Sequence, residues 1–348
     1  MSLIILSAKD VDQVIQKATP QELLRLMGKV FAALQQEYPD NVSPHPVQLP
    51  HRLTVHMPSH TTLFMPSRLA SAGGTAMKVV SIPLGHSHNG LPATTIVMDE
   101  ESGRVRAVVN ARSLTAVRTA AGSALAVSLI GPPEPERLVL FGAGLQMLHH
   151  GLILLRMYPS IRSCTVVNRT GNARLESVMK ALAKAFPKVL LRSLSSSDRE
   201  NEAAIRHCVS DAHIICSATS STTPLYESDW VQSGTCIVLV GSYKPTMHEI
   251  PYKLVKRASI VVVDSASACL QEAGELIAAE LKPSDLVELG DLLDDEGLPL
   301  AGAVDIAKTE GDVTIFKSVG IGLQDVSIAS LVVEAAISMG LGTEIDYD

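Results

Sequence analysis

The chain has 348 residues, of which 46% are hydrophobic but only 3% aromatic. A chain of this length is expected to form about two domains, and cores built mainly from Ala, Val, Leu and Ile suit layered α/β folds. The formal net charge of −7, without any basic run, argues against nucleic acid and anionic membranes as main partners. A small-molecule metabolite fits this charge better.

The cysteine pattern and the amino-terminal residues predict a cytoplasmic protein. The cysteines lack a Cys-x-x-Cys pair and mostly lie in apolar segments, so we expect reduced, buried thiols. They are Cys164, Cys208, Cys216, Cys236 and Cys269. Residues 1–7 have no basic region before their short apolar run, and no segment approaches about 18 uninterrupted apolar residues.

The first hundred residues predict a mixed α+β unit. An amphipathic helix is expected around Pro20–Tyr38, and the turn Asp99–Gly103 is expected to join two strands as a hairpin. The strand candidates are Leu53–His56, Thr62–Met65, Ala76–Ile82, Thr94–Asp99 and Arg104–Val109. A long helix at Ala111–Ile130 then leads to Pro132-Pro133, which we interpret as the linker to a second domain.

The second domain opens with an apolar strand that enters a Gly142-x-Gly144 turn and leaves on a helical pattern. In such a turn the glycines allow the backbone to approach a dinucleotide pyrophosphate, and the helix N-terminus supplies free N–H groups. We therefore assign Gly142, Ala143, Gly144, Leu145 and Gln146 to a cofactor. Met147 occupies the third glycine position of the fingerprint, so a tight turn without a ligand remains the alternative.

The next expected strand, Cys164–Val167, predicts which dinucleotide is bound. NAD enzymes usually place Asp or Glu after this strand to bind the ribose 2′-hydroxyl, whereas Asn168 is neutral. Arg169, Thr170 and Arg174 can donate to a 2′-phosphate, with charge-assisted bonds worth roughly 1.5 to 3 kcal/mol each. NADPH or NADP is therefore the expected cofactor, and an ordinary surface turn is the alternative.

Apolar runs alternate with helical patterns through the rest of this domain and predict a doubly wound parallel sheet of the Rossmann type. The expected strands are Leu138–Phe141, Cys164–Val167, Val189–Leu191, His213–Cys216, Cys236–Val240 and Ile260–Val263. Ala218, Thr219 and Ser318 are further expected cofactor contacts. A helix at Ile328–Met339 returns to the first domain. The expected fold is thus α/β, with a substrate-binding and dimerisation domain of residues 1–120 and 321–348 and a dinucleotide-binding domain of residues 121–320.

Several short motifs occur in order along nearly the whole chain. They are Met65-Pro66, Met77–Val80, Leu114–Ala121, Gly142–Gln146, Asn168–Thr170, Gly241-Ser242 with Glu249, and Phe316–Gly320 with Asp325. Together this set resembles the ornithine cyclodeaminase/mu-crystallin family. The resemblance implies a homodimer with the amino-terminal β domain at its interface, and a Rossmann domain facing a cleft between the two domains.

The resemblance also implies that Arg52, Lys78 and Arg118 hold a substrate carboxylate near the nicotinamide, with Tyr243 and Gly320 in the same pocket. The residue types agree, because a 2-imino or 2-amino acid must present its α carbon to the nicotinamide C4, and cations on its carboxylate set that orientation. Lys78 lies in an apolar strand and Arg118 in an Ala-rich helix, so both need an anionic partner. We also assign Lys78 as the catalytic residue, which either protonates the substrate nitrogen or tunes the iminium.

One departure from the family pattern favours reduction over deamination. Cyclodeaminases of this family carry a catalytic Asp where this chain has Tyr243, in Gly241-Ser242-Tyr243-Lys244-Pro245. Without that carboxylate the base that activates water is missing. The leading hypothesis is an NADPH-dependent reductase of a C=N bond next to a carboxylate, such as a cyclic ketimine or imino acid. The alternatives are an ornithine cyclodeaminase or amino-acid dehydrogenase, and a non-catalytic NADPH-dependent small-molecule binding protein.

Metal sites and other active sites have little support in the sequence. His51, His56, His60, His86 and His88 have no Cys or carboxylate at ligand spacing, so no metal is expected. The acidic stretch Asp291–Glu296 lacks the alternating ligands of a calcium loop and is expected to be a solvated surface loop. A Gly-x-Ser-x-Gly elbow is absent, which removes support for a hydrolase triad.

Overall fold

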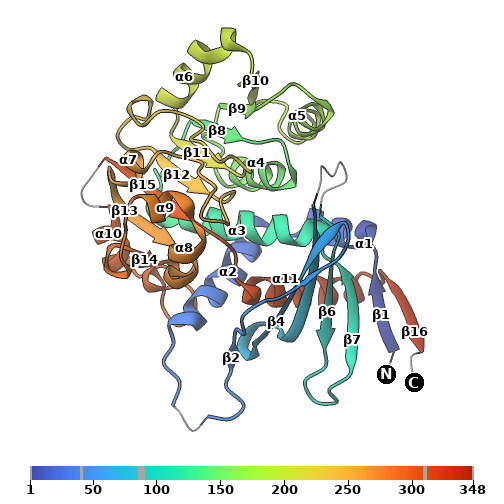
Figure 1. The fold of residues 1–348 in the computed structure, drawn as a ribbon. Helices are drawn as coiled ribbons and strands as arrows, with labels where there is room; N and C mark the ends of the chain where they lie inside the picture. The colour runs from blue at the N-terminus through green and yellow to red at the C-terminus, as the bar shows by residue number, and fades with distance from the viewer. Residues whose placement is uncertain (1, 40–41, 85–90, 309–311, 347–348) are drawn as a thin grey trace. The chain divides into compact units, whose positions relative to one another are not determined.

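The computed structural model describes residues 2–39, 42–84, 91–308 and 312–346 (Figure 1). The chain divides into two compact units. The first unit comprises Met1–Thr119, Asp295–Leu298 and Gly320–Asp348, and the second comprises Ala120–Asp294 and Pro299–Val319. The predicted boundaries placed Asp295–Leu298 in the nucleotide domain. This segment instead belongs to the first unit, where Gly297 lies so close to Gly28 that a Cβ on Gly28 would be 2.3 Å from the Gly297 carbonyl oxygen.

The first unit is built on a mixed sheet in the order β16-β1-β7-β6-β5-β4-β2, with β3 paired to β4. Its strands are β1 (Ser2–Leu6), β2 (Val47–Gln48), β3 (Leu53–His56), β4 (His60–Leu69), β5 (Gly74–Pro83), β6 (Ala93–Met98), β7 (Val105–Asn110) and β16 (Thr343–Asp346). Its pairs are antiparallel except β1 with β7. Buried and half-buried residues alternate along β5, β6 and β7, as expected of strands with one covered face.

Helix α11 (Gly322–Ser338) packs on β4, β5 and β6, and α1 (Ala8–Lys17) and α2 (Pro20–Gln35) pack on α11. Capping boxes start the two amino-terminal helices, with Ser7 and Thr19 as the cap residues. The hairpin around Asp99–Gly103 is present as predicted. Helix α1 and strands β1 and β16 were not predicted from the sequence, and α11 begins six residues before its predicted start at Ile328.

The second unit contains a parallel sheet in the order β10-β9-β8-β11-β12-β15-β13-β14. Its strands are β8 (Arg137–Phe141), β9 (Ser163–Asn168), β10 (Leu190–Ser195), β11 (Ile214–Ser217), β12 (Cys236–Leu239), β13 (Ala258–Val263), β14 (Val287–Glu288) and β15 (Val313–Lys317). From β8 the chain builds outward in one direction through β9 and β10 and then in the other direction through β11 and β12, which is the doubly wound arrangement. The predicted α/β fold class is thus confirmed.

The helices of the second unit connect these strands. They are α4 (Leu145–Met157), α5 (Ala173–Ala185), α6 (Glu202–Ser210), α7 (Tyr252–Val255), α8 (Ala266–Glu272), α9 (Gly274–Ala278) and α10 (Ala301–Lys308), with 3-10 turns at Arg199–Asn201, Ser228–Trp230, Pro283–Asp285 and Leu289–Leu292. The 3-10 turn Ala70–Ala72 belongs to the first unit. Helix α3 (Arg112–Ile130) precedes them. Its length and composition would allow it to cross a membrane, but 83% of its most apolar window is buried inside the protein, as in a core helix.

His150 is a buried polar residue that links α4 to α3. Its Nε2 lies 2.9 Å from Ser123 Oγ, and its Nδ1 lies 2.7 Å from the Gln146 carbonyl oxygen. Burial lowers the pKa of His150 from 6.5 to about 4. The imidazole is therefore neutral in the folded protein near neutral pH, and it shares hydrogen bonds between two packed helices.

We predict that His150 makes the protein less stable in acid. Because its folded pKa lies below its unfolded pKa, the unfolded chain binds more protons, and this contribution to stability is lost as pH falls from 6.5 towards 4. At pH 5 it corresponds to about 2 kcal/mol of unfolding free energy. Urea unfolding of the wild type and of His150→Asn at pH 7.5 and at pH 5 checks this. Between the two pH values, His150→Asn should lose about 2 kcal/mol less unfolding free energy than the wild type. Equal losses in both proteins would contradict it.

Candidate functional site

The turn between β8 and α4 has the geometry of a phosphate-binding loop. Gly142 is buried with φ of +112°, and a Cβ there would lie 2.9 Å from the Ala218 carbonyl oxygen. Gly144 is the N-cap residue of α4, and a Cβ there would meet no atom within 4 Å. The first glycine is therefore required by conformation and packing, whereas the second leaves open space in front of a helix N-terminus. Met147, at the third glycine position, is fully buried.

A cavity of about 500 Å³ opens at this turn, within the range of small-molecule sites. Most of the predicted cofactor contacts line it. They are Gly142, Ala143, Gly144, Asn168, Arg169, Thr170, Arg174, Ala218 and Thr219, joined by Phe141, Val167, Asn172, Ser196, Ser220, Ser221, Thr223, Pro224 and Leu225. The predicted contacts Leu145 and Gln146 form the first turn of α4, and the Gln146 Oε1 is buried without a hydrogen-bond partner.

The far end of the cavity, after β9, is rich in donors. Arg169, Thr170 and Arg174 are exposed. The Asn168 side chain donates to the Thr170 carbonyl oxygen at 2.8 Å, and Asn172 caps α5 by accepting from the N–H groups of Arg174 and Leu175. Local hydrogen bonds thus fix the backbone of this loop while two guanidinium groups lie along the cavity. The arrangement can receive an anionic group.

A buried glutamate on the loop after β12 holds two of the loops at the carboxyl end of the sheet. Glu249 accepts from the N–H and hydroxyl of Thr219 at 2.7 and 2.9 Å, and from the Gly241 N–H at 2.6 Å. Burial raises the pKa of Glu249, while Lys317 and the donor N–H groups oppose this. A Cβ on Gly241 would lie 2.1 Å from the Thr219 carbonyl oxygen. The loop that lines the cavity and the loop that carries Tyr243 are therefore joined.

Two further buried carboxylates hold the neighbouring loops. The Lys317 ammonium donates to the Ser242 hydroxyl and carbonyl oxygens at 2.6 and 2.7 Å, and Glu275 accepts from the Ser242 hydroxyl at 2.5 Å. Lys317 and Glu275 also form an ion pair of 3.3 Å with both side chains fully buried. Asp264 accepts from the Ser318 hydroxyl at 2.7 Å and from the Val319 N–H at 3.0 Å.

This network changes the interpretation of one predicted contact. Ser318 was expected to contact the cofactor; its hydroxyl donates to Asp264, and Ser318 is not among the residues that line the cavity. Sequence reasoning gave no role to Lys317, Glu275 or Asp264. The sequence feature that could have identified these residues is a charged side chain within or beside an apolar segment, as in the run Thr314–Lys317. Tyr243 is half-buried next to the anchored Ser242, and the Lys244 ammonium lies 5.5 Å from the centre of its ring.

Two of the three predicted substrate cations, Lys78 and Arg118, form a buried cluster with Asp325 in the first unit. The Lys78 ammonium lies 2.5 Å from Asp325 Oδ2, and the Arg118 Nε donates to Asp325 Oδ1 at 3.1 Å. All three residues are at most 4% exposed. Strand register places Lys78 opposite Met65, and α11 packs on both strands, which brings Asp325 to them. The sequence motif had included Asp325 without a role for it.

The surroundings of this cluster fix the orientation of its arginine. Arg118 Nη1 donates to the Gln324 side-chain oxygen at 2.8 Å. Gly320 has a φ of +87°, and a Cβ there would lie 2.9 Å from both terminal guanidinium nitrogens of Arg118. Burial is the main cause that lowers the pKa of Lys78; Asp325 opposes it, whereas Arg118 and Arg52 add to it. Arg52 is exposed and precedes β3, so its charge contributes to the cluster from the side of solvent.

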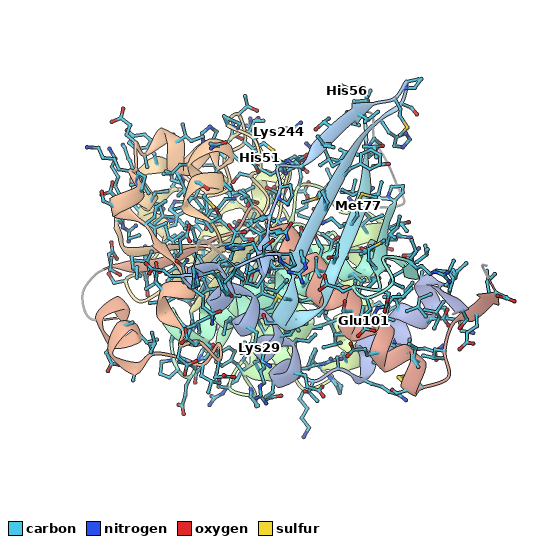
Figure 2. The ribbon with its side chains drawn as sticks, turned by 90° about the horizontal axis from the view of Figure 1, so that it is seen from below. Lys29, His51, His56, Met77, Glu101 and Lys244 are labelled. Atoms are coloured by element: carbon cyan, nitrogen blue, oxygen red, sulfur yellow. The ribbon has the colours of Figure 1, made fainter. Side chains whose placement is uncertain are left out.

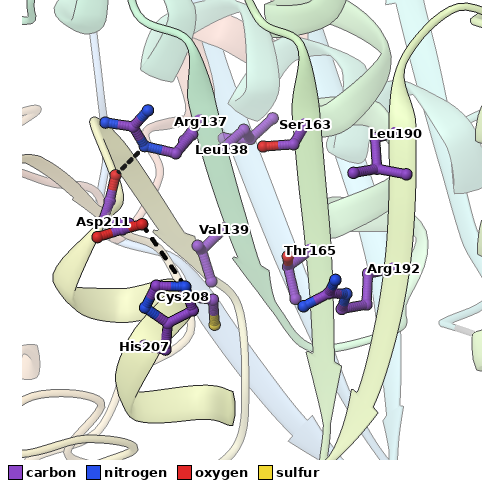
Figure 3. Close-up of a pocket in the computed structure, with 10 residues that line it drawn as sticks. All are labelled: Arg137, Leu138, Val139, Ser163, Thr165, Leu190, Arg192, His207, Cys208 and Asp211. Atoms are coloured by element: carbon purple, nitrogen blue, oxygen red, sulfur yellow. Dashed lines mark hydrogen bonds and ion pairs between the residues drawn. The ribbon is translucent and has the colours of Figure 1, made fainter.

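A second, smaller cavity and the histidines offer no comparable arrangement. The cavity of about 120 Å³ lies between α6 and strands β8 to β10, where Arg137 donates to the Asp211 carbonyl oxygen (Figure 3). His51 precedes β3 and His56 ends it, so they lie at opposite ends of this strand (Figure 2). Among the described residues, no group of three His, Cys, Asp or Glu could hold a metal ion. His86 and His88 lie outside the described residues.

Fold and site together define a Rossmann-type α/β protein with a separate α+β unit. The family model of the ornithine cyclodeaminase/mu-crystallin family matches residues 8–340, and the chain belongs to this family. It is 30% identical over 295 residues to the ketimine reductase mu-crystallin of Rattus norvegicus, covering 83% of this chain and 85% of that protein. It is 27% identical to a Delta(1)-pyrroline-2-carboxylate reductase of Bacillus cereus, with the same coverage.

A solved structure shows the same fold over nearly the whole chain. The Delta(1)-pyrroline-2-carboxylate reductase of Thermococcus litoralis, in complex with NADH and L-proline, superposes with a TM-score of 0.81 at 21% identity. The match covers 99% of this chain and 100% of that one. That protein is bound to NADH, so the preference for NADPH expected from Arg169 stays a prediction.

We predict that Gly320→Ala displaces Arg118. The added methyl group would lie against the guanidinium, and a φ of +87° is strained for alanine. The expected cost is about 1 to 3 kcal/mol of unfolding free energy. Urea unfolding measures it, and Gly340→Ala is the control because it has a similar φ of +64° but no atom within 4 Å of the added Cβ. If Gly320→Ala lost no more unfolding free energy than Gly340→Ala, Gly320 would be required only for its backbone conformation and not for the position of Arg118.

Proposed function

We propose that this protein is a reductase of C=N bonds next to a carboxylate and that it uses NADPH. The observation that carries the proposal is the buried cluster of Lys78, Arg118 and Asp325, which contains two cations and one carboxylate. One positive charge is left without a negative partner inside the cluster. A buried net charge is costly, and the carboxylate of an imino acid would compensate it.

The chemistry requires an oriented, protonated imine. When bound, reduced nicotinamide supplies a hydride from C4 to the imine carbon, and the π electrons of the C=N bond pass to a nitrogen that carries a proton. Arg118 holds the carboxylate in our proposal, and its fixed guanidinium plane suits two parallel hydrogen bonds. Lys78 is the proposed proton donor, because burial lowers its pKa and so eases release of its proton. Arg52 and Tyr243 complete the proposed substrate contacts, and the relatives that act on ketimines and pyrroline-2-carboxylate support this class.

The direct test is oxidation of NADPH with a panel of imino acids. Cyclic substrates such as pyrroline-2-carboxylate and acyclic imines formed from a 2-oxo acid and an amine should be reduced, whereas a cyclic imine without the carboxylate should not. Arg118→Ala should lower kcat/KM by about ten to a few hundredfold while cofactor binding persists. Oxidation that is independent of the carboxylate would contradict the proposal, and cofactor binding without turnover would favour the non-catalytic alternative.

The same protein should not convert ornithine to proline. Tyr243 occupies the position of the cyclodeaminase Asp, and a tyrosine is a poor base at neutral pH compared with a carboxylate. Incubation with ornithine and NAD⁺ or NADP⁺, followed by measurement of proline and ammonia, tests this alternative. Robust formation of proline would require another base and would overturn the reductase proposal.

The proposed preference for NADPH rests on the loop after β9. This loop places Arg169, Thr170 and Arg174 at the cavity, and its Asn168 brings no negative charge. We predict that Arg169→Ala weakens NADPH binding about tenfold or more, since a charge-assisted hydrogen bond is lost, and leaves NADH binding nearly unchanged. Fluorescence titration with both cofactors measures the two affinities. Equal affinities in the wild type would remove the basis for this assignment.

We also propose that the protein is a homodimer formed through the first unit. Leu53 and Val55 on β3 are 66% and 50% exposed, and Met57 beside them is 41% exposed. A row of apolar side chains on a strand is typical of a surface that a partner covers. Light scattering should give twice the 37.0 kDa mass of the chain, and Leu53→Glu should yield monomers. A wild type that is monomeric at micromolar concentration would refute the dimer.

A further inference from the structure

Asp325 is the only described carboxylate that contacts the two buried cations of the first unit. It reaches them from α11 with different oxygens, Oδ2 towards Lys78 at 2.5 Å and Oδ1 towards the Arg118 Nε at 3.1 Å. Its own pKa is lowered: burial acts to raise it, but the charges of Arg118 and Lys78 outweigh burial. Asp325 is therefore ionised inside the protein and acts as an internal counter-charge.

The charge balance of the cluster depends on this residue. The charged groups that face Lys78 are Asp325 from α11, Arg118 from α3 and Arg52 ahead of β3, and Asp325 is the one that favours the charged ammonium. With Asp325 ionised, the buried cluster has a net charge of +1. Without it, two cations would share a dry site, and the lysine could release its proton far more easily than the arginine.

We propose that Asp325 is a positioning residue that keeps Lys78 charged and leaves the cluster with one positive charge for a substrate carboxylate. This inference rests on the proposed function, because it assumes that a carboxylate binds at Lys78 and Arg118. Asp325 acts through these two cations and makes no contact with the substrate in this scheme. Removal of its charge should therefore change the protonation of Lys78, which a purely structural role would leave unchanged.

The test measures proton uptake when a carboxylate binds. Pyrrole-2-carboxylate is a planar carboxylate that has no C=N bond to reduce, so it serves as the probe with NADP⁺-saturated protein. Calorimetry in buffers of different ionisation enthalpy gives the number of protons taken up between pH 6 and 9. In the wild type, uptake should begin at the pH where Lys78 loses its proton in the free protein. In Asp325→Asn this onset should fall by at least about one pH unit, because an opposite charge is lost.

A matched variant separates this effect from a general change of charge. Glu334 lies on the same helix with a side chain that is 71% exposed, and its contact is a surface ion pair of 3.8 Å with Arg106. Glu334→Gln should leave the onset of proton uptake at its wild-type pH. An onset that is the same in Asp325→Asn as in the wild type would overturn the proposal. If the wild type failed to bind the probe at all, the proposed carboxylate site itself would be wrong.

A double variant keeps the proposal testable if Asp325→Asn does not fold. Lys78→Met lowers the net charge of the cluster from +1 to 0 and should weaken probe binding at least tenfold. Lys78→Met with Asp325→Asn restores a net charge of +1 on Arg118 and should regain much of that affinity, without proton uptake. If Asp325 were only structural, the second substitution would weaken binding further, and that result would refute the charge balance.

Discussion

Buried charge requires compensation, and this requirement organises both units of the protein. In the first unit, Asp325 compensates Lys78 and Arg118 within the α11 and β5 packing. In the second, Glu275 lies 3.3 Å from Lys317 at the end of β15. Such pairs contribute little net stability compared with apolar packing, but removal of one partner leaves a charge stranded in a dry interior. Their value is that each fixes one geometry for the segments that it joins.

In the second unit, the loops at the carboxyl end of the sheet depend on buried carboxylates. Parallel strands end there with N–H groups that have no further strand to pair with. Glu249, Glu275 and Asp264 accept from residues that follow β11, β12 and β15. The loops are therefore joined to one another and to the sheet, so the cavity beside Gly142 has walls that are largely formed in advance.

Local patterns in the sequence predicted the parts of the fold that follow from local chemistry. Alternation along Ala76–Ile82 and the glycines at Gly142 and Gly144 identified β5 and the nucleotide turn. Strand β15 was not predicted, since it follows a helix late in the chain yet inserts between β12 and β13. Strand β16 has exposed residues without apolar alternation, so pairing with β1 is its main determinant.

In the candidate site, too, local patterns predicted some residues, whereas others depend on contacts between distant parts of the chain. Lys78 and Arg118 were identified as cations within apolar segments that need an anion, and family resemblance gave them a role. Their buried partner Asp325 is 207 residues from Arg118 in sequence, so no local pattern connects the two. Ser318 was assigned to the cofactor, whereas its hydroxyl donates a hydrogen bond to Asp264, which lies 54 residues away in sequence. Long-range pairing of charges is what a single sequence conceals.

The pairing of β1 with β16 gives the chain an almost circular path. Ser2 lies opposite Asp346 in an antiparallel ladder, so the first and last described strands run side by side at the edge of one sheet. The second unit is then, in topological terms, one long insertion that begins within α3, at Ala120, and ends at Val319 before α11, interrupted only by the short segment Asp295–Leu298. A short peptide bridge between these two strands would allow new termini to be opened in an exposed turn such as Asp99–Gly103. The order of elements along the gene is thus one of several that the same set of contacts could support.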